Sequence, residues 1–164
     1  MPFQIQSLSK YEINLILDLQ KETYTQDLLE NSECFLHKIK IFPAGVFGAF
    51  SSKKLIGYIF FHPWKIDVQV PLNNHEYLLP ENTDCIYIHD IAINHKQRNK
   101  KIGYALFDEA ITYGNNHNFN NYALTAVQNS ETYWERWGYV KQYGSTYGES
   151  SSIYMVCKGL PVWR

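Results

Sequence analysis

The segment from Tyr87 to Leu106, YIHDIAINHKQRNKKIGYAL, holds the residues best suited to chemistry. Closely spaced isoleucines in a buried-strand pattern lead into a basic turn, and apolar residues at helical spacing follow directly. The turn carries four cations within six residues, namely Lys96, Arg98, Lys100 and Lys101. Backbone N–H groups at a helix start attract phosphate oxygens, and nearby cations add to this attraction. The pattern therefore favours a phosphate-binding turn, with a solvated basic turn that binds no ligand as the alternative.

Two common nucleotide motifs, G-x-x-x-x-G-K-S/T and G-x-G-x-x-G, are absent, because Gly103 is the only glycine in this segment. The run from Arg98 to Gly103, RNKKIG, instead resembles the acyl-CoA-binding motif Q/R-x-x-G-x-G/A of the GNAT N-acetyltransferases. Upstream, HDIAIN is similar to the fourth strand of that family. Downstream, AVQNSETYWERWGYV is similar to its fifth strand, the following helix and an aromatic-glycine turn. The resemblance covers roughly residues 55 to 140.

The resemblance implies acetyl-CoA as the acyl donor and CoA as the product. The residues implied at the phosphate turn are Arg98, Asn99, Lys100, Lys101, Ile102, Gly103, Tyr104 and Ala105. Those implied along the pantetheine arm are Ile91, Ala92 and Ile93, through their main chain, together with Asn129 and Trp134. Asn129 or Ser130 is almost equally expected to cap the next helix. Lys101 replaces the first motif glycine, so its backbone is expected either to adopt ordinary helical angles or to carry strain.

Direct transfer needs a neutral amine, because an ammonium has no lone pair with which to attack a thioester. The resemblance places His89 as the general base, since an imidazole titrates near physiological pH. The alternative for His89 is a hydrogen bond to a neighbouring loop, in which case Tyr87 could act as the base through water. Asp90 is expected on the opposite strand face, with a structural role. Trp134 stands where many relatives carry an acidic tyrosine, so either Tyr133 protonates the thiolate or the thiolate leaves unaided.

The acceptor is expected to be an amine of a small molecule or a peptide. In this family the first two helices, the loop after the third strand and the last hairpin build the acceptor pocket. The residues expected to line it are Tyr24, Glu30, His62, Trp64 and Tyr147. Glu30 is interpreted either as an attractor of a cationic amine or as a surface carboxylate on a helix. An acyltransferase for longer acyl-CoA and a non-catalytic acyl-CoA-binding module are the alternative functions, and a homodimer is left open.

The composition suits one compact domain over residues 1–164, with 45% hydrophobic and 19% charged residues. A formal net charge of -1 argues against nucleic-acid binding, which favours a strong basic excess. Cys34, Cys85 and Cys157 lie too far apart for a zinc motif or a disulfide framework, so we expect no metal site and a cytoplasmic location. We expect neither secretion nor membrane insertion, because no apolar run has the required length or flanks.

The alternation of patterns predicts the order of the elements. We expect a strand over Phe3–Leu8, helices from Ser9 or Lys10 and around Asp27–Lys38, a hairpin of Gly45–Phe50 and Leu55–His62, and a long loop over Pro63–Asn82. After the central helix we expect a strand over Tyr122–Val127, a helix from Ser130 that Gly138 ends, and strands over Tyr139–Tyr143 and Ile153–Lys158. The polar run GSTYGESSS between the last two is expected to be a mobile tip. This order matches the GNAT acyl-CoA N-acyltransferase fold. It is an α+β fold with three layers, α/β/α, around a mixed, mostly antiparallel sheet of about seven strands that splays between strands 4 and 5.

Overall fold

The computed structural model describes residues 2–147 and 149–164 of the chain. The strands are β1 (Gln4–Ser7), β2 (Val46–Ser51), β3 (Lys54–Trp64), β4 (Cys85–Ile93), β5 (Asn121–Ala126), β6 (Val140–Tyr147) and β7 (Ser150–Lys158). The α-helices are α1 (Ile13–Thr23), α2 (Ser32–Ile41), α3 (Ile102–Asn116) and α4 (Glu131–Glu135). Short 3-10 turns cover Lys10–Glu12, Gln26–Leu28, Pro43–Gly45 and His95–Gln97. The predicted order of elements is therefore confirmed.

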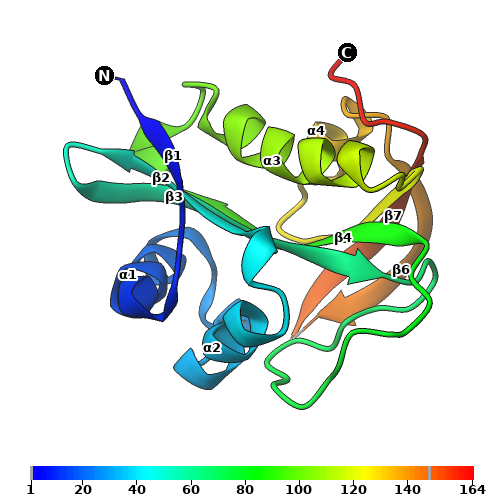
Figure 1. Cartoon of the computed structure of the whole chain (residues 1–164), viewed down its shortest axis with the longest axis horizontal. Coiled ribbons are helices and arrows are strands. Elements are labelled where there is room, and N and C mark those ends of the chain that lie inside the picture. The colour runs from blue at the N-terminus through cyan, green and yellow to red at the C-terminus, as the bar shows by residue number, and fades with distance from the viewer. Residues whose placement is uncertain (1, 148) are drawn as a thin grey trace.

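The strands form one seven-stranded sheet in the order β1-β2-β3-β4-β5-β7-β6. Strands β4 and β5 pair in parallel, and all the other pairs are antiparallel. Figure 1 shows α1 and α2 on one face of this sheet and α3 and α4 on the other. The predicted three-layer α+β fold with a mixed, mostly antiparallel sheet is confirmed.

Local sequence signals explain where the first elements begin. Ser9 caps the first helical turn through a capping box, in which its backbone N–H donates to Glu12 Oε2 at 2.8 Å. Asn31 caps α2 by accepting from the backbone N–H of Cys34 at 3.0 Å. Ser52 and Lys53, at φ 48° and 67°, both adopt the left-handed backbone that a two-residue hairpin turn requires. These contacts fix where α1 and α2 begin and set the register of the β2–β3 hairpin.

The last hairpin is longer than the sequence predicts. We expected the polar run from Gly144 to Ser152 to be a mobile tip, but most of it lies in paired strands, with Gly144 opposite Ile153 and Thr146 opposite Ser151. The tip extends past the core at the sheet edge, so its strands lack the apolar residues by which a half-buried strand is identified. The expectation of a loop was wrong because it treated polarity as evidence against a strand.

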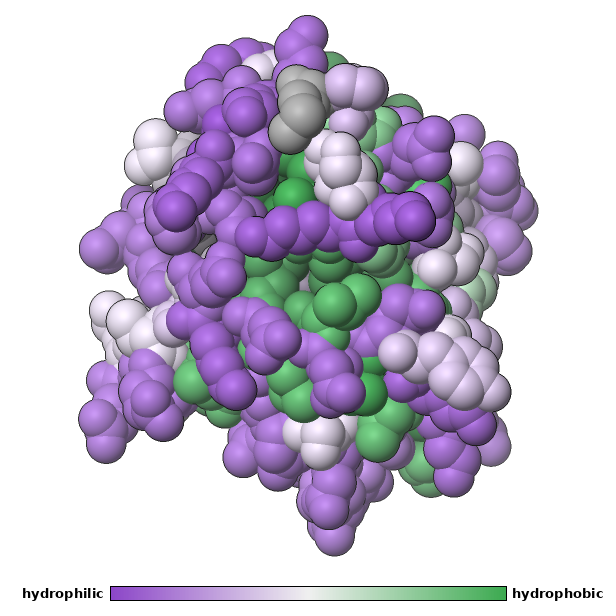
Figure 2. All heavy atoms as spheres, turned by 90° about the vertical axis from the view of Figure 1, so that its left-hand side faces the viewer, coloured by the Kyte–Doolittle hydropathy of each residue, from purple (hydrophilic) through white to green (hydrophobic). Residues whose placement is uncertain are grey.

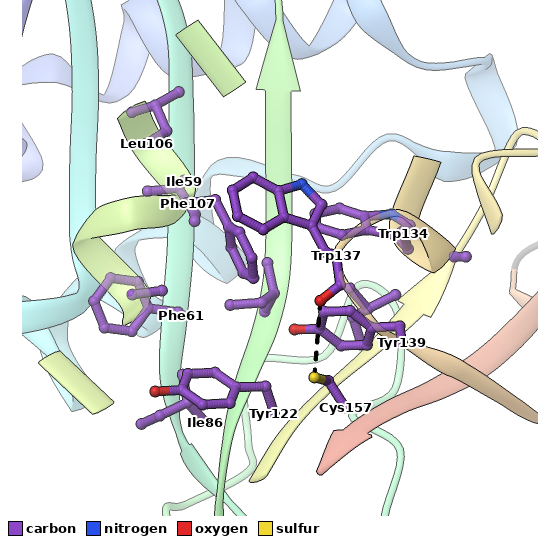
Figure 3. Packing of buried hydrophobic residues seen from close by; sticks show 14 of the residues in the cluster. Ile59, Phe61, Ile86, Leu106, Phe107, Tyr122, Trp134, Trp137, Tyr139 and Cys157 are labelled. Carbon is purple, nitrogen blue, oxygen red and sulfur yellow. Dashed lines mark hydrogen bonds between the residues drawn. The ribbon is translucent and has the colours of Figure 1, made fainter. Parts of the chain in front are cut away.

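Aromatic side chains pack α3 and α4 onto the sheet. Phe107 of α3 lies 4.7 Å from Trp137 and 5.5 Å from Trp134, measured between ring centroids. Figure 3 shows these rings above Tyr139 and Cys157, whose Sγ contacts the carbonyl oxygen of Trp137 at 3.9 Å. This packing holds α4 rigidly beside the gap between β4 and β5.

Figure 2 shows the side of the molecule that lies at the left of Figure 1, with apolar residues gathered in its middle and hydrophilic residues around them.

Cys34, Cys85 and Cys157 are free thiols and buried. Within residues 2–147 and 149–164, no helix is long and apolar enough to span a membrane. The same residues contain no group of three or more His, Cys, Asp or Glu side chains that could hold a metal ion.

Candidate active site between the splayed strands

Strands β4 and β5 pair only over a short stretch. The register joins Ile86 to Tyr122 and ends where Ile88 faces Leu124. Beyond this point the two strands separate, as the family resemblance implies, and no strand of the described residues lies beside the second edge of β4. A cleft of about 1260 Å³ occupies the gap and extends from the start of α3 to the end of α1. The predicted site residues therefore divide into those that line this cleft and those that do not.

The start of α3 forms one end of the cleft. No side chain caps this helix, so its first backbone N–H groups are available to a ligand. The residues of the turn that line the cleft are Gln97, Arg98, Asn99, Lys101, Ile102, Gly103 and Tyr104. Lys100 does not line it and instead donates from Nζ to Gln97 Oε1 at 2.9 Å, and Ala105 lies outside it as well. The turn thus brings most of the predicted phosphate-binding residues together.

Lys101 carries the strain that the sequence left open. Its backbone is left-handed, with φ 62° and ψ 14°, at the position just before the first helical residue. An L-residue other than asparagine or aspartate rarely adopts these angles, which suit the motif glycine. Asn99, at φ 63°, is left-handed too but belongs to a residue type that tolerates this region. The turn therefore keeps the backbone path of a glycine at a position that holds a lysine.

A β-bulge in β4 decides which side chains reach the cleft. Phe60 of β3 pairs with Asp90, and the next residue, Phe61, pairs with Ile88. His89 is therefore the extra residue that the bulge inserts between these two pairs. A bulge interrupts the alternation of side chains, which lets His89 and Asp90 both line the cleft. The expectation that Asp90 points away from His89 to the opposite face was wrong, because it assumed an unbroken strand. Ala92 packs instead into the core under α1.

His89 is neutral in this environment. Its Nδ1 lies 3.2 Å from the hydroxyl of Tyr77, and its Nε2 is buried with no hydrogen-bond partner. Burial, together with the positive charge of Lys38, holds the pKa of His89 well below its usual value. The neutral imidazole is therefore a weak proton acceptor, and Nε2 itself lies beneath the surface of the cleft that His89 lines.

Asp90 is the functional candidate that the sequence reasoning placed in a structural role. Its Oδ1 accepts from the hydroxyl of Tyr24 at 2.6 Å, and its Oδ2 accepts from the hydroxyl of Tyr58 at 3.0 Å. Burial raises the pKa of Asp90 to about 6, although Lys38 opposes this shift. The Tyr24 hydroxyl also lies 2.6 Å from the carbonyl oxygen of Ile91. Tyr24 lines the cleft, as predicted, and joins Asp90 to the main chain of β4.

Three predicted site residues lie behind the cleft wall. Tyr87, His62 and Trp64 are buried, with 1%, 2% and 7% of their surface exposed, and none of them lines the cleft. Their rings pack around His89, with centroids of His62 and His89 5.6 Å apart. The Tyr87 hydroxyl lies 2.8 Å from Thr125 Oγ1, and Thr125 does line the cleft. The expectation that His62 and Trp64 line the acceptor pocket was wrong, because both point into an aromatic cluster.

Glu30 lines the cleft but is not the surface carboxylate on a helix that the sequence allowed. It lies in the link before α2, is buried, and forms an ion pair with Lys38. Its other carboxylate oxygen accepts from the backbone N–H of Asn73 at 2.9 Å. Because both oxygens are engaged within the protein, Glu30 holds the long loop after β3 in place. The side chain of Tyr147, which was also expected in this pocket, lies outside the described part of the chain.

The region around α4 provides the remaining wall. Tyr133 and Trp134 line the cleft as predicted, whereas Asn129 lies in a separate shallow depression beside the β6–β7 hairpin. Trp163, Arg136 and Trp137 line the cleft without having been predicted. The backbone N–H of Arg164 donates to the carbonyl oxygen of Arg136 at 2.7 Å, which brings the C-terminal segment against α4. No motif marked Trp163, because its position depends on this contact.

Comparison with known proteins agrees with this geometry. Residues 13–139 match the model of the acetyltransferase (GNAT) family. The chain therefore belongs to the GNAT acetyltransferase family, whose members transfer acyl groups from CoA to amines. It is an acyl-CoA-dependent N-acyltransferase. None of the curated proteins compared with this chain matches it.

Solved structures share the fold at low sequence identity. The loading GNATL domain of CurA from Lyngbya majuscula superposes with a TM-score of 0.81 at 11% identity, over 96% of this chain and 98% of that one. Ard1 from Thermoplasma volcanium gives 0.78 at 13%, over 98% and 99%. The PaiA N-acetyltransferase from Thermoplasma acidophilum, in complex with coenzyme A, gives 0.71 at 17%, over 96% and 99%. At these identities the similarity is one of fold.

Proposed function

We propose that this protein transfers an acetyl group from acetyl-CoA to a primary amine of a small molecule or a peptide, by direct attack in a ternary complex. One observation carries the proposal. A single cleft joins an uncapped, cation-flanked helix start to two consecutive polar side chains, His89 and Asp90, on a strand that is unpaired along that edge. Phosphate groups fit the first feature, and amine chemistry fits the second.

The residues present fit a CoA-type donor. Arg98 and Lys101 would pair with phosphate oxygens, and the N–H groups of Ile102 and Gly103 would donate to them. A Cβ atom at Gly103 would lie 3.1 Å from both Ile93 Cδ1 and the Tyr133 hydroxyl, so a larger residue there would push these two side chains aside. The main chain of β4 beyond Ile88 has its second edge open to an extended ligand. We assign the pantetheine arm to this edge, beside Ile91 and Ile93.

The reacting groups would meet where the strands part. A backbone N–H near Ile91 would donate to the thioester carbonyl oxygen as the amine attacks, which stabilises the negative charge that develops there. His89 lines the cleft at this point, and its neutral imidazole ring would pack beside the amine. Tyr133 keeps its proton, because burial raises the pKa of its hydroxyl, and it lines the cleft as a candidate donor to the departing thiolate. Trp134 packs against Phe107 and Tyr139 and acts as a wall.

Calorimetric titration with acetyl-CoA, followed by a thiol-release assay over a panel of amines, tests the proposal. We expect binding and CoA release that depends on an amine. Binding without turnover of any amine would favour a non-catalytic acyl-CoA-binding module, and a preference for longer acyl-CoA would change the donor. We also propose a cytoplasmic location, because Cys34, Cys85 and Cys157 are unpaired.

A further inference from the structure

Tyr24, Tyr58 and Asp90 form a hydrogen-bonded group that opens into the cleft, in which Tyr58 is buried and Tyr24 and Asp90 are half-buried. The three side chains come from the end of α1, from β3 and from the bulge of β4. Asp90 receives a hydroxyl on each of its oxygens, at 2.6 Å from Tyr24 and at 3.0 Å from Tyr58. A carboxylate with two directed donors is fixed in position, because each donor restricts the rotation of the carboxyl group.

The contacts of Tyr24 show how this group can hold a proton. The Tyr24 hydroxyl lies 2.6 Å from Asp90 Oδ1 and also 2.6 Å from the carbonyl oxygen of Ile91, yet it has one hydrogen to donate. When Asp90 is ionised, that hydrogen points to the carboxylate. When Asp90 is protonated, the carboxyl donates to Tyr24, and Tyr24 donates to Ile91. In both states Asp90 and Tyr24 keep a hydrogen bond to each other without moving a heavy atom, so the group is prepared to take up and release a proton.

The charges around Asp90 define what it can bind. Lys38 of α2 is the nearest cation, but its ammonium pairs with Glu30, which lies in the link between α1 and α2. Tyr24 of α1 and Tyr58 of β3 face Asp90 with neutral hydroxyls, and His89 on its own strand is neutral. Among the described residues that line the cleft, the cations are Arg98, Lys101 and Arg136, which belong to the turn and to the end of α4. Within the described part of the chain, the end near Asp90 therefore has no unpaired cation and favours a cationic ligand.

Two leucines lie at this end beside the polar residues Thr23 and Gln128. Leu28 and Leu72 line it, from the link before α2 and from the long loop after β3. An acceptor that carried a carboxylate next to its amine would bring that charge toward Asp90, and among the described residues the nearest cation, Lys38, is already paired with Glu30. An acceptor with an apolar body would instead bury its surface against the two leucines.

We propose that Asp90, held by Tyr24 and Tyr58, binds the substrate ammonium and takes its proton, and that the acceptor is a primary amine with an apolar body and no carboxylate. This inference rests on the proposed function. The ammonium gives one proton to the Asp90 carboxylate, and the freed lone pair forms the C–N bond at the thioester carbonyl carbon. As the C–S bond breaks, the second proton leaves nitrogen for the thiolate sulfur, which yields CoA. Asp90 then releases its proton to solvent.

A matched pair of amines tests the acceptor class. 2-Phenylethylamine and phenylalanine share one body and differ by the carboxylate, and thiol release is measured for both with acetyl-CoA. We expect kcat/KM for 2-phenylethylamine to exceed that for phenylalanine by about 100-fold or more, because like charges oppose the second. Equal rates, or faster turnover of phenylalanine, would overturn the acceptor class while leaving the proposed acetyl transfer intact. Turnover of neither, nor of any amine in a wider panel, would contradict the proposed function itself.

The Asp90→Asn variant tests the proton acceptor, since it keeps the shape and removes the charge. We expect kcat/KM to fall by about 10²–10⁴-fold. The pH profile separates a catalytic from a structural role. The wild type takes the ammonium, so kcat/KM for total amine should be level between about pH 7 and 9. In Asp90→Asn only the free amine in solution reacts, so kcat/KM should rise about tenfold per pH unit toward the amine pKa near 10. A level profile in both proteins would overturn the assignment.

Calorimetric binding of acetyl-CoA reports whether Asp90→Asn is folded, and we expect an unchanged Kd because Asp90 lies away from the phosphate turn. Tyr24→Phe provides a second route if the asparagine variant does not fold. It removes a hydrogen bond that lowers the pKa of Asp90, so the acid limb of the wild-type profile, near pH 6, should move to higher pH. An unmoved acid limb in Tyr24→Phe would overturn the role of this pair.

Discussion

Lys101 tests whether the phosphate turn keeps the shape of the family motif at a cost in stability. Its backbone angles, φ 62° and ψ 14°, are those of glycine, and its side chain is exposed. A left-handed backbone costs an L-residue about 1–2 kcal/mol. Glycine avoids this cost but gives the unfolded chain more freedom, which removes about 0.4–1 kcal/mol of stability. Lys101→Gly should therefore raise the free energy of unfolding by about 0.5–1 kcal/mol, and Tm by about 1–4 °C.

Two control variants isolate the cause of this gain. Lys101→Ala removes the same charge but keeps the left-handed strain, so it should show no gain in Tm. Asn99→Gly changes a left-handed residue that tolerates its angles at φ 63° and should stay near the wild type. The measurements are thermal and urea unfolding of the ligand-free proteins. Equal stability of the glycine and alanine variants at residue 101 would refute the reasoning, since it would show that the backbone there carries no strain.

Three further predictions concern the turn and the buried histidines. Arg98→Ala should weaken CoA binding by about tenfold in calorimetry through the loss of a phosphate contact. Lys100→Ala, which removes a cation outside the cleft, should change Kd by less than about twofold. Similar losses of affinity in both variants would show that net charge alone attracts the ligand. His89→Gln should lower kcat by about tenfold or more with little change in acetyl-CoA affinity, and an unchanged kcat would remove His89 from the reacting centre. His62 has its pKa lowered to about 4 by burial, so the unfolded state binds more protons below its ordinary value near 6.5. The contribution of neutral His62 to the free energy of unfolding should thus be fully present above pH 6.5 and fall by about 3 kcal/mol as the pH drops toward 4. His62→Phe should reduce this loss of stability at acid pH, measured by urea titration. An identical pH dependence of the variant would contradict the assignment.

The fold and the position of the basic turn before α3 could be predicted from sequence because their signals are local. Isoleucines in a strand, a basic turn and a helical stripe follow one another within one short segment, and Gly138 ends the last helix with φ 92° as expected. The RNKKIG run needs no knowledge of distant residues to be compared with a motif. Trp134 and Tyr133 were placed correctly for the same reason, since one short helix carries both.

The acceptor end could not be predicted because it depends on contacts between distant residues. Tyr24 and Asp90 are 66 positions apart in the chain, and their hydrogen bond forms only once α1 lies beside β4. The bulge at His89 has no local mark, since any residue type can occupy it, yet it turns Asp90 into the cleft. His62 and Trp64 were misplaced by the same kind of error, because strand β3 continues through Pro63 and directs both rings into the interior.

The cleft concentrates features that a fold selected for stability alone would avoid. Lys101 holds a glycine conformation, the start of α3 lacks a side-chain cap, and His89 Nε2 is buried without a partner. Each feature lowers stability, and all three line or border one continuous space. Strain and unsatisfied polar atoms at functional sites are compensated when a ligand occupies them. Acetyl-CoA at saturating concentration should therefore raise Tm more in the wild type than in an Arg98→Ala variant, and equal Tm shifts in the two proteins would place the ligand away from this turn.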